Sequence, residues 1–204
     1  KINPILKDRI NIIKMDGFKL NDKIQIIKNY LLPDLFKEYI RNRRNIHRMS
    51  DSGVIESVKF NHKKFYDLSN DELYDILRLR SLVFNHQQNV IQLSGGECVE
   101  IDGEDKKCGH IIGRGENEEI VATARLFDNN ESFRLGRLAV HPELQKKGIG
   151  KLVMNYLDSI IDSKPIDMHA QSYLIDWYSK LGWSVKGEEF MECGIKHIIM
   201  TKNQ

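Results

Sequence analysis

A regular stripe of apolar residues between positions 149 and 161 constrains the fold of this chain more than any other feature. Its members are spaced by three and four residues: Ile149, Leu152, Val153, Tyr156, Leu157, Ile160 and Ile161. Side chains at these intervals lie on one face of an α-helix, and an apolar face of this length has to be buried against another layer. We expect this helix to lie on a β-sheet.

Short apolar segments separated by turn signals predict the strands of that sheet. They cover residues 110–115, 120–127, 133–140, 166–171, about 183–190 and about 195–201. Within 166–171 the apolar side chains alternate with polar ones, as expected for a strand with one buried face.

Two further helices are predicted from local signals. Ser69 and Glu72 have the spacing of a capping box, which predicts a helix that ends near Phe84. The other helix carries Tyr178 on its apolar stripe and ends at Gly182, because glycine readily takes the left-handed conformation that terminates helices.

Length and composition allow one sizeable domain and an appendage. The chain has 204 residues, 41% of them hydrophobic, which is enough for one core with about fifty residues left over. No segment has the roughly 18 consecutive apolar residues of a membrane-spanning helix, and none resembles a signal peptide, so we expect a soluble, cytoplasmic protein. The three cysteines, odd in number and without metal-type spacing, favour reduced thiols.

Charge is distributed unevenly along the chain. Residues 1–49 hold twelve Lys and Arg against five Asp and Glu, whereas the whole chain has a net charge of +2. The basic cluster in this segment has no interleaved aromatic residues and no nucleic-acid motif; it consists of Arg41, Arg43, Arg44 and Arg48. We interpret it as a solvated face or a linker and do not expect nucleic-acid binding.

A glycine-containing loop connects the strand 133–140 to the long helix. Residues 145–150 read QKKGIG. Glycines at this junction let backbone N–H groups approach a phosphate, and the helix start adds its own donors and positive dipole end. A Rossmann fingerprint needs G-x-G-x-x-G and a Walker loop needs G-K-[ST], so neither pattern fits. Taken alone, the string also fits an ordinary loop before a helix.

The strand, loop and helix together resemble motif A of the GNAT superfamily of acyl-CoA N-acyltransferases. The resemblance continues in the family's order through residues 100–113, 121–127, 169–183 and 188–200. Together these segments resemble the ElaA-type branch of the superfamily. The resemblance implies an α/β (α+β) fold: a mixed, mostly antiparallel central sheet, splayed at the cofactor strand and flanked by helices, with a short helical N-terminal extension. It also implies an N-acetyltransferase that moves an acetyl group from acetyl-CoA to a primary amine by direct attack in a ternary complex.

The same resemblance implies where acetyl-CoA binds. Backbone groups of Leu138, Ala139 and Val140 would contact pantetheine, and the Val140 amide would face the thioester carbonyl, where it would stabilise negative charge. The pyrophosphate would be held by the loop and the helix start, which comprise Gln145, Lys146, Lys147, Gly148, Ile149, Gly150 and Lys151.

Catalytic roles follow from the resemblance as well. Tyr178 matches the tyrosine that protonates the departing thiolate, although its position on an apolar stripe also fits a core residue. The attacking amine needs a base, and Glu192 and His169 are our first candidates. Other residues at the acceptor end are Glu100, Asp102, His110, Gln171 and His197, of which Glu100, Asp102 and His197 are further base candidates. For His197, in an apolar strand, a structural role is an equal alternative. No residue set predicts a metal site.

Residues 2–38 are similar to a different family, the Lon-type AAA+ ATPases, from the arginine finger into the helical lid, with Arg9 at the finger position. Without a Walker A loop or a Ser/Lys protease segment, we expect neither ATPase nor peptidase activity. We therefore predict an extension at 1–48, a linker at 49–57 and an acetyltransferase domain at 58–204. The expected partners are a small-molecule or peptide amine and, because family members often pair, a second copy of the chain. The alternative function is a non-catalytic CoA-binding accessory module of a Lon-like protein.

Overall fold

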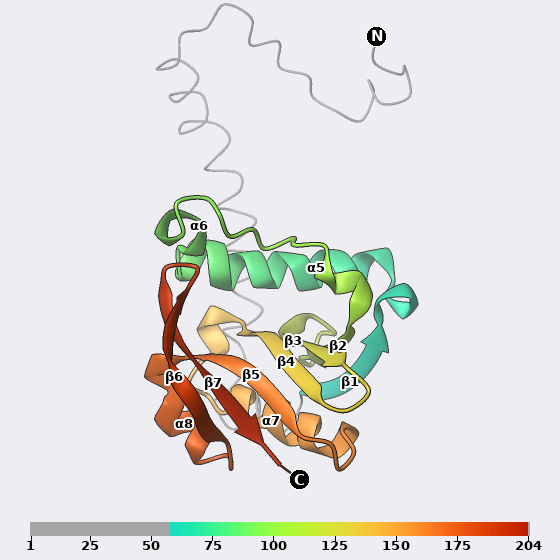
Figure 1. The fold of residues 1–204 in the computed structure, drawn as a ribbon. Helices are drawn as coiled ribbons and strands as arrows, with labels where there is room; N and C mark the ends of the chain where they lie inside the picture. Colours follow the sequence, from blue (N-terminus) through green and yellow to red (C-terminus); the bar gives the residue numbers. More distant parts are fainter. Residues whose placement is uncertain (1–57, 204) are drawn as a thin grey trace, which may run out of the picture. The chain divides into compact units, whose positions relative to one another are not determined.

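The computed structural model describes residues 58–203 of the chain (Figure 1). The predicted extension at 1–48, with its resemblance to Lon-type ATPases and its basic cluster, lies outside the described residues. So does the predicted linker at 49–57.

The described part is built around one seven-stranded sheet with the order β1-β2-β3-β4-β5-β7-β6. Neighbouring strands are antiparallel except for β4 and β5, which are parallel. This is the mixed, mostly antiparallel sheet that the family resemblance implies. The strands are β1 (Lys59–Lys64), β2 (Gly109–Arg114), β3 (Ile120–Asp128), β4 (Phe133–Val140), β5 (Ile166–Gln171), β6 (Ser184–Glu192) and β7 (Ile195–Lys202).

The sheet opens between β4 and β5. Backbone pairing joins these strands at only three positions, from the Phe133–Ile166 pair to the Leu135–Met168 pair. Beyond that point β4 contains a bulge against β3, and Arg137 in the bulge has a φ of 49°. A bulge adds a residue on one strand and bends it away from its neighbour. The expected splay of the sheet is therefore present at the C-terminal end of β4.

Helices cover both faces of the sheet (Figure 1). α5 (Asn70–Arg80) packs Ile76 and Leu79 against Ile112 and Ala139 of the sheet, and α7 lies on the other side of the strands. The remaining helical elements are a π-helix (Ser81–Gln87), α6 (Val90–Leu93), α7 (Ile149–Ile160), α8 (Ile175–Ser179) and 3₁₀ turns at Phe65–Asp67, Glu104–Lys107, Pro142–Leu144 and Ser172–Leu174.

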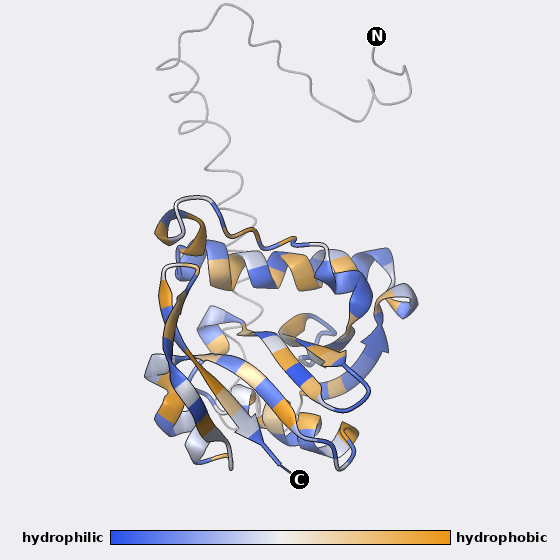
Figure 2. Ribbon diagram, viewed as in Figure 1, coloured by the Kyte–Doolittle hydropathy of each residue, from blue (hydrophilic) through white to orange (hydrophobic). Residues whose placement is uncertain are grey.

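Most predicted elements are confirmed. The capping box at Ser69 and Glu72 is present, and Gly182 has a φ of 86°, as expected for a left-handed helix terminator. The sequence analysis missed β1, whose residues KFNHKK are almost all hydrophilic, as Figure 2 shows by the blue colour of this strand. An edge strand can remain polar because its backbone pairs on one side only.

The expectation of three reduced cysteines is wrong. Cys98 and Cys193 form a disulfide with a Cα–Cα distance of 5.7 Å, and Cys108 is free and buried. The two bonded residues are 95 positions apart, and only the fold brings the loop after α6 beside the β6–β7 turn, so an odd count could not reveal the pair. None of the helices in residues 58–203 has the length and apolar character to cross a membrane.

Candidate active site

The loop between β4 and α7 exposes backbone donors at one end of a helix. Lys146 and Gly148 both have left-handed backbone conformations, with φ values of 61° and 88°. Gly148 is the N-cap of α7, and no side chain caps this helix within the described chain. The first N–H groups of a helix have no partner inside the helix, and the helix dipole makes this end positive. The loop therefore offers uncapped donors suited to a phosphate.

The side chains of the loop differ in exposure. Lys146 and Lys151 are exposed, Lys147 is half-buried, and Ile149 is buried in the core, so Ile149 offers the site only its backbone. Gly150 lies against a neighbouring ring: a Cβ atom added there would be 3.3 Å from Trp177 of α8. The start of α7 is thus packed closely against α8.

Gln145 fixes the loop to two other elements. Its Nε2 donates to the Val140 carbonyl oxygen (3.0 Å), and its amide exchanges two hydrogen bonds with Gln87 at the end of the π-helix, each 2.9 Å long. The neighbouring residue Gln88 makes an equivalent reciprocal contact with Gln171 at the end of β5, at 3.0 and 3.4 Å. The end of the π-helix and its C-cap residue Gln88 thus contact both sides of the gap between β4 and β5.

The backbone amide of Val140 points into that gap. His141 N donates to the Val121 carbonyl oxygen on β3 (2.8 Å). Along an antiparallel ladder, the hydrogen-bonding groups of successive residues point alternately to the two sides. Ala139 therefore faces β3 like His141, whereas the amide of Val140 points toward β5. Since β5 pairs with β4 only as far as Leu135, this amide faces the splayed region. Together with the α7 donors it suits an extended ligand that ends in a pyrophosphate.

Tyr178 lies in the core on α8, next to Trp177, the ring that lies against Gly150 of α7. Only 6% of its surface is exposed, and its ring packs edge-to-face against Trp177 and Trp183. Burial raises the pKa of Tyr178 above its usual value, so the hydroxyl group keeps its proton at neutral pH.

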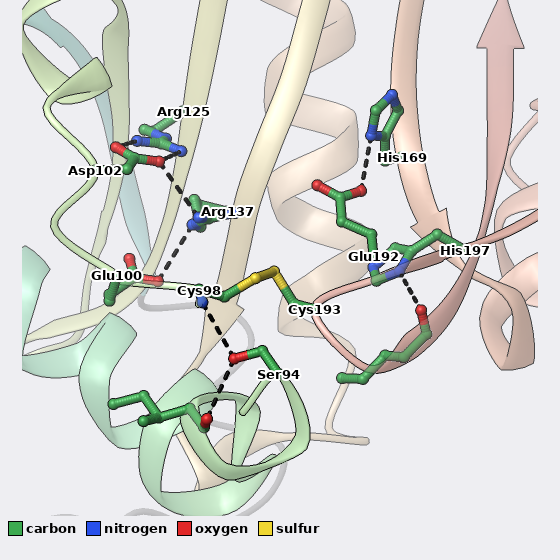
Figure 3. Close-up of a disulfide and its surroundings, with 12 residues drawn as sticks. Ser94, Cys98, Glu100, Asp102, Arg125, Arg137, His169, Glu192, Cys193 and His197 are labelled. Atoms are coloured by element: carbon green, nitrogen blue, oxygen red, sulfur yellow. Dashed lines mark hydrogen bonds and ion pairs between the residues drawn. A yellow bond between two sulfur atoms is a disulfide. The ribbon is translucent and has the colours of Figure 1, made fainter. Parts of the chain in front are cut away.

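His169 and Glu192 meet on the other side of the gap (Figure 3). Nδ1 of His169 on β5 lies 2.8 Å from Oε2 of Glu192 on β6. Because a carboxylate can only accept, Nδ1 is the donor in this pair, so in the neutral imidazole the lone pair is on Nε2. Phe190 packs edge-to-face against the His169 ring.

His197 is held differently. It is buried on β7, and its Nδ1 donates to the Ile195 carbonyl oxygen at 2.9 Å. Its ring stacks on Phe190. These contacts hold His197 within the β6–β7 strand pair and favour a structural role for it.

Glu100 and Asp102 belong to a network of charged side chains that the sequence analysis missed. Asp102 accepts two hydrogen bonds from Arg125 (2.8 and 2.9 Å) and one from Arg137 (3.3 Å). Glu100 pairs with Arg137 Nε at 3.2 Å and with the fully buried Arg80. The sequence gives no sign of this network, because its members come from a helix, two strands and a loop.

The neighbouring arginines oppose the effect of burial on the pKa values of Glu100 and Asp102 to different degrees. Burial raises the pKa of Glu100, and the Arg80 and Arg137 guanidiniums oppose that shift. For Asp102, burial also raises the pKa, but hydrogen bonds from Arg125 and the Glu104 amide outweigh it and hold the pKa well below its usual range. Asp102 is therefore a poor proton acceptor, and both carboxylates already have cationic partners.

His110 is a buried residue of β2. It is completely buried, its Nε2 donates to the Asp105 carbonyl oxygen (3.1 Å), and burial lowers its pKa. Asp105, Cys108 and His110 offer three potential metal ligands within 4.8 Å of one another. However, Arg80 donates to Asp105 at 2.5 Å, and burial raises the pKa of the Cys108 thiol to about 12. A guanidinium and a protonated thiol favour a structural role for this group.

Comparisons with known proteins show the family and the fold that this chain shares. Residues 101–204 match the model of the acetyltransferase (GNAT) domain. The chain is 33% identical over 154 residues to UPF0039 protein C11D3.02c of Schizosaccharomyces pombe, a match that covers 72% of this chain and 97% of that protein. It is 32% identical over 145 residues to protein ElaA of Escherichia coli, covering 67% and 90%. The crystal structure of ElaA superimposes with a TM-score of 0.62 at 29% identity, covering 72% and 99% of the two chains. An acyl-CoA N-acyltransferase from Pseudomonas aeruginosa gives a TM-score of 0.63 at 25% identity, covering 72% and 99%.

Proposed function

Because the chain belongs to the GNAT acetyltransferase family, we propose that it transfers an acetyl group from acetyl-CoA to a primary amine, which attacks the thioester directly in a ternary complex. The observation that carries the proposal is the gap between β4 and β5, with the Val140 amide directed into it and the uncapped start of α7 beyond its end. A thioester on an extended arm, joined to a pyrophosphate, matches this order of donors.

The binding of acetyl-CoA rests mainly on backbone groups. The pyrophosphate would accept hydrogen bonds from amides at Gly148 to Lys151, at the positive end of α7. Lys146 and Lys151 are exposed beside these amides and would add positive charge. The pantetheine arm would pair with backbone groups at the end of β4, from Leu138 to Val140, as a strand pairs with a sheet edge.

The two proton transfers of the reaction are assigned to two side chains, one acting as base and one as acid. We assign the base to His169, whose Nε2 would take the proton of the attacking amine while Glu192 stabilises the imidazolium through Nδ1. We assign the acid to Tyr178, which would give its proton to the departing thiolate. The Val140 amide would donate to the thioester carbonyl oxygen, on which negative charge grows during the attack.

The charged network explains why His169 is preferred over the other base candidates. Glu100 and Asp102 already pair with two arginines each, so taking up a proton would break these ion pairs. His197 is buried and bonded within its own strand pair. Of the two histidines among the base candidates, His169 is the one that combines a carboxylate partner with a half-exposed ring.

Binding and turnover should be measured separately. Calorimetry with acetyl-CoA and with CoA should give saturable binding. A panel of peptide, lysine, polyamine and amino-sugar amines should then cause loss of the thioester absorbance, a readout that does not depend on thiol reagents and so is not affected by Cys108. Absence of binding would reject the proposal. Binding without transfer to any amine would favour the alternative of a non-catalytic CoA-binding module.

A further inference from the structure

A disulfide bridges the open end of the splayed sheet. On one side, Cys98 lies two residues before Glu100, whose carboxylate is paired with Arg137 in the β4 bulge at 3.2 Å. On the other side, Cys193 directly follows Glu192, whose carboxylate contacts His169 on β5. Figure 3 shows the disulfide between these two groups of charged residues. It therefore connects the β4 side of the site to the β5 side, beyond the point where the strands separate.

The two connected segments also touch through their backbones. Gly194 has a φ of 74°, and a Cβ atom added there would lie 2.4 Å from the Leu93 carbonyl oxygen at the end of α6. The Cys98 amide donates to Ser94 Oγ at 3.1 Å, which keeps Cys98 beside the same helix end. The turn between β6 and β7 is thus held against the loop after α6 by one covalent bond and one close backbone contact.

We propose that the Cys98–Cys193 disulfide is a redox-controlled strap that sets the width of the acceptor side of the site. The inference rests on the proposed function for its effect on catalysis. Both cysteines are half-buried, so a dithiol reductant can reach them, whereas Cys108 is buried. Reduction breaks the S–S bond; two electrons and two protons pass from the dithiol to the two sulfur atoms, and the dithiol closes to its own disulfide.

The strap acts on the acceptor and not on acetyl-CoA. Glu192 and the loop containing Glu100 lie next to the bonded cysteines, whereas the donors for the pyrophosphate belong to the start of α7, which neither segment contains. Freeing the turn allows Glu192 to move away from the β4 side and from His169, which stays on β5. Amine binding then weakens while cofactor binding remains.

The test compares the oxidised protein, the protein reduced by dithiothreitol, and the double variant Cys98→Ser, Cys193→Ser. Hydrogen exchange should rise in residues 94–99 and 191–195 of the reduced and variant proteins. The KM for the amine should rise about five- to tenfold, the lower part of the range for coupled sites, and the calorimetric Kd for acetyl-CoA should stay within about twofold. The double variant should not respond to dithiothreitol, and Cys108→Ala should respond as the unmodified protein does.

Each contrary result has a definite meaning. Unchanged exchange in both segments after reduction would overturn the strap, whatever the activity. Equal weakening of amine and acetyl-CoA binding would also overturn it, since it would indicate general loosening. If no amine is acetylated but exchange still depends on the redox state, the proposed function has failed and the strap has not. Reduction of the unmodified protein provides the comparison if the double variant does not fold.

Discussion

Nδ1 of His169 and Oε2 of Glu192 are 2.8 Å apart, although the two residues lie on strands that do not pair with each other. His169 is on β5 and Glu192 on β6, and β7 lies between these strands. The contact crosses over β7 at the level of Phe190, whose ring touches both His169 and His197. This arrangement fixes the orientation of the imidazole ring and directs the lone pair of Nε2 away from the carboxylate.

We expect His169→Ala to lower kcat/KM about 10²- to 10⁴-fold, the usual contribution of a general base, with little change in the Kd for acetyl-CoA. Glu192→Gln should produce a smaller loss, and the double variant should lose no more than His169→Ala, because the two residues act as a unit. Glu189→Gln, an exposed carboxylate on the same strand, is the control. Steady-state kinetics at saturating acetyl-CoA will measure these effects; additive losses would contradict the pairing.

The Tyr178→Phe variant tests whether Tyr178 acts as a general acid or only as a core residue. If Tyr178 protonates the thiolate, kcat should fall about 10²- to 10⁴-fold while the melting temperature changes by only a few degrees, because the ring that packs against Trp177 and Trp183 remains. Calorimetry of unfolding and single-turnover kinetics will distinguish the two effects. Full activity in a destabilised variant would assign Tyr178 to the core alone.

Gly148→Ala tests the loop before α7. An alanine at a φ of 88° is strained by about 1–2 kcal/mol, and relief of this strain moves the donor amides away from the phosphate. Gly187→Ala is a matched control, since Gly187 has a φ of 85° with no atom within 4 Å of an added Cβ, and lies on β6. Both variants should lose similar stability in urea. Only Gly148→Ala should bind acetyl-CoA at least tenfold more weakly.

The charged network should contribute strongly to stability. Arg80→Met leaves Glu100 and Asp105 buried without their shared partner, and breaking a buried ion pair in this way costs about 3–5 kcal/mol. Arg78→Met, on the same helix, removes an exposed arginine whose ion pair among residues 58–203 is with Asp75 and should cost well under 1 kcal/mol. Urea unfolding at pH 7 will measure both; equal losses would show that the network is not coupled to folding.

Glu72 should make stability depend on pH in the acid range. Burial raises its pKa, but hydrogen bonds from Lys63, the Ser69 amide and Arg114 outweigh it and lower the pKa from 4.5 to about 2. A carboxyl group with a depressed folded-state pKa stabilises the protein above its unfolded pKa, so the contribution is complete above about pH 4.5 and is lost as the pH falls to about 2. Unfolding curves of Glu72→Gln should therefore show a loss at pH 7 that shrinks over this interval. Asp71→Asn, in the same helical turn, serves as the control.

Local patterns predicted the elements of the fold better than they predicted the site. The stripe on α7, the alternation on β5 and the capping box are each encoded within about a dozen residues, so spacing alone reveals them. By contrast, the salt bridges of Arg80 and the Cys98–Cys193 bond join residues 20 to 95 positions apart. Such pairs depend on the tertiary fold, and β1 was missed because an edge strand needs little apolar character.

The site was predicted in part for the same reason. The loop containing Gly148 is a local motif, and the structure places it at the start of α7 as expected. Glu100 and Asp102 were expected to face the acceptor, but the structure pairs them with arginines. Arg125 lies on β3 and Arg137 on β4, far from the loop in sequence, so only the tertiary fold reveals that these carboxylates form ion pairs.

The helix α7 is the crossover connection between the parallel strands β4 and β5, and parallel strands can be joined only through such a long connection. The same helix thus connects the two parts of the sheet and carries, in its first turn, the backbone amides proposed to bind phosphate. Any ligand bound there is linked to the formation of that crossover, since ligands that bind only the folded state raise its stability by mass action. Acetyl-CoA should therefore act as a thermal stabiliser of the whole sheet and not of the loop alone.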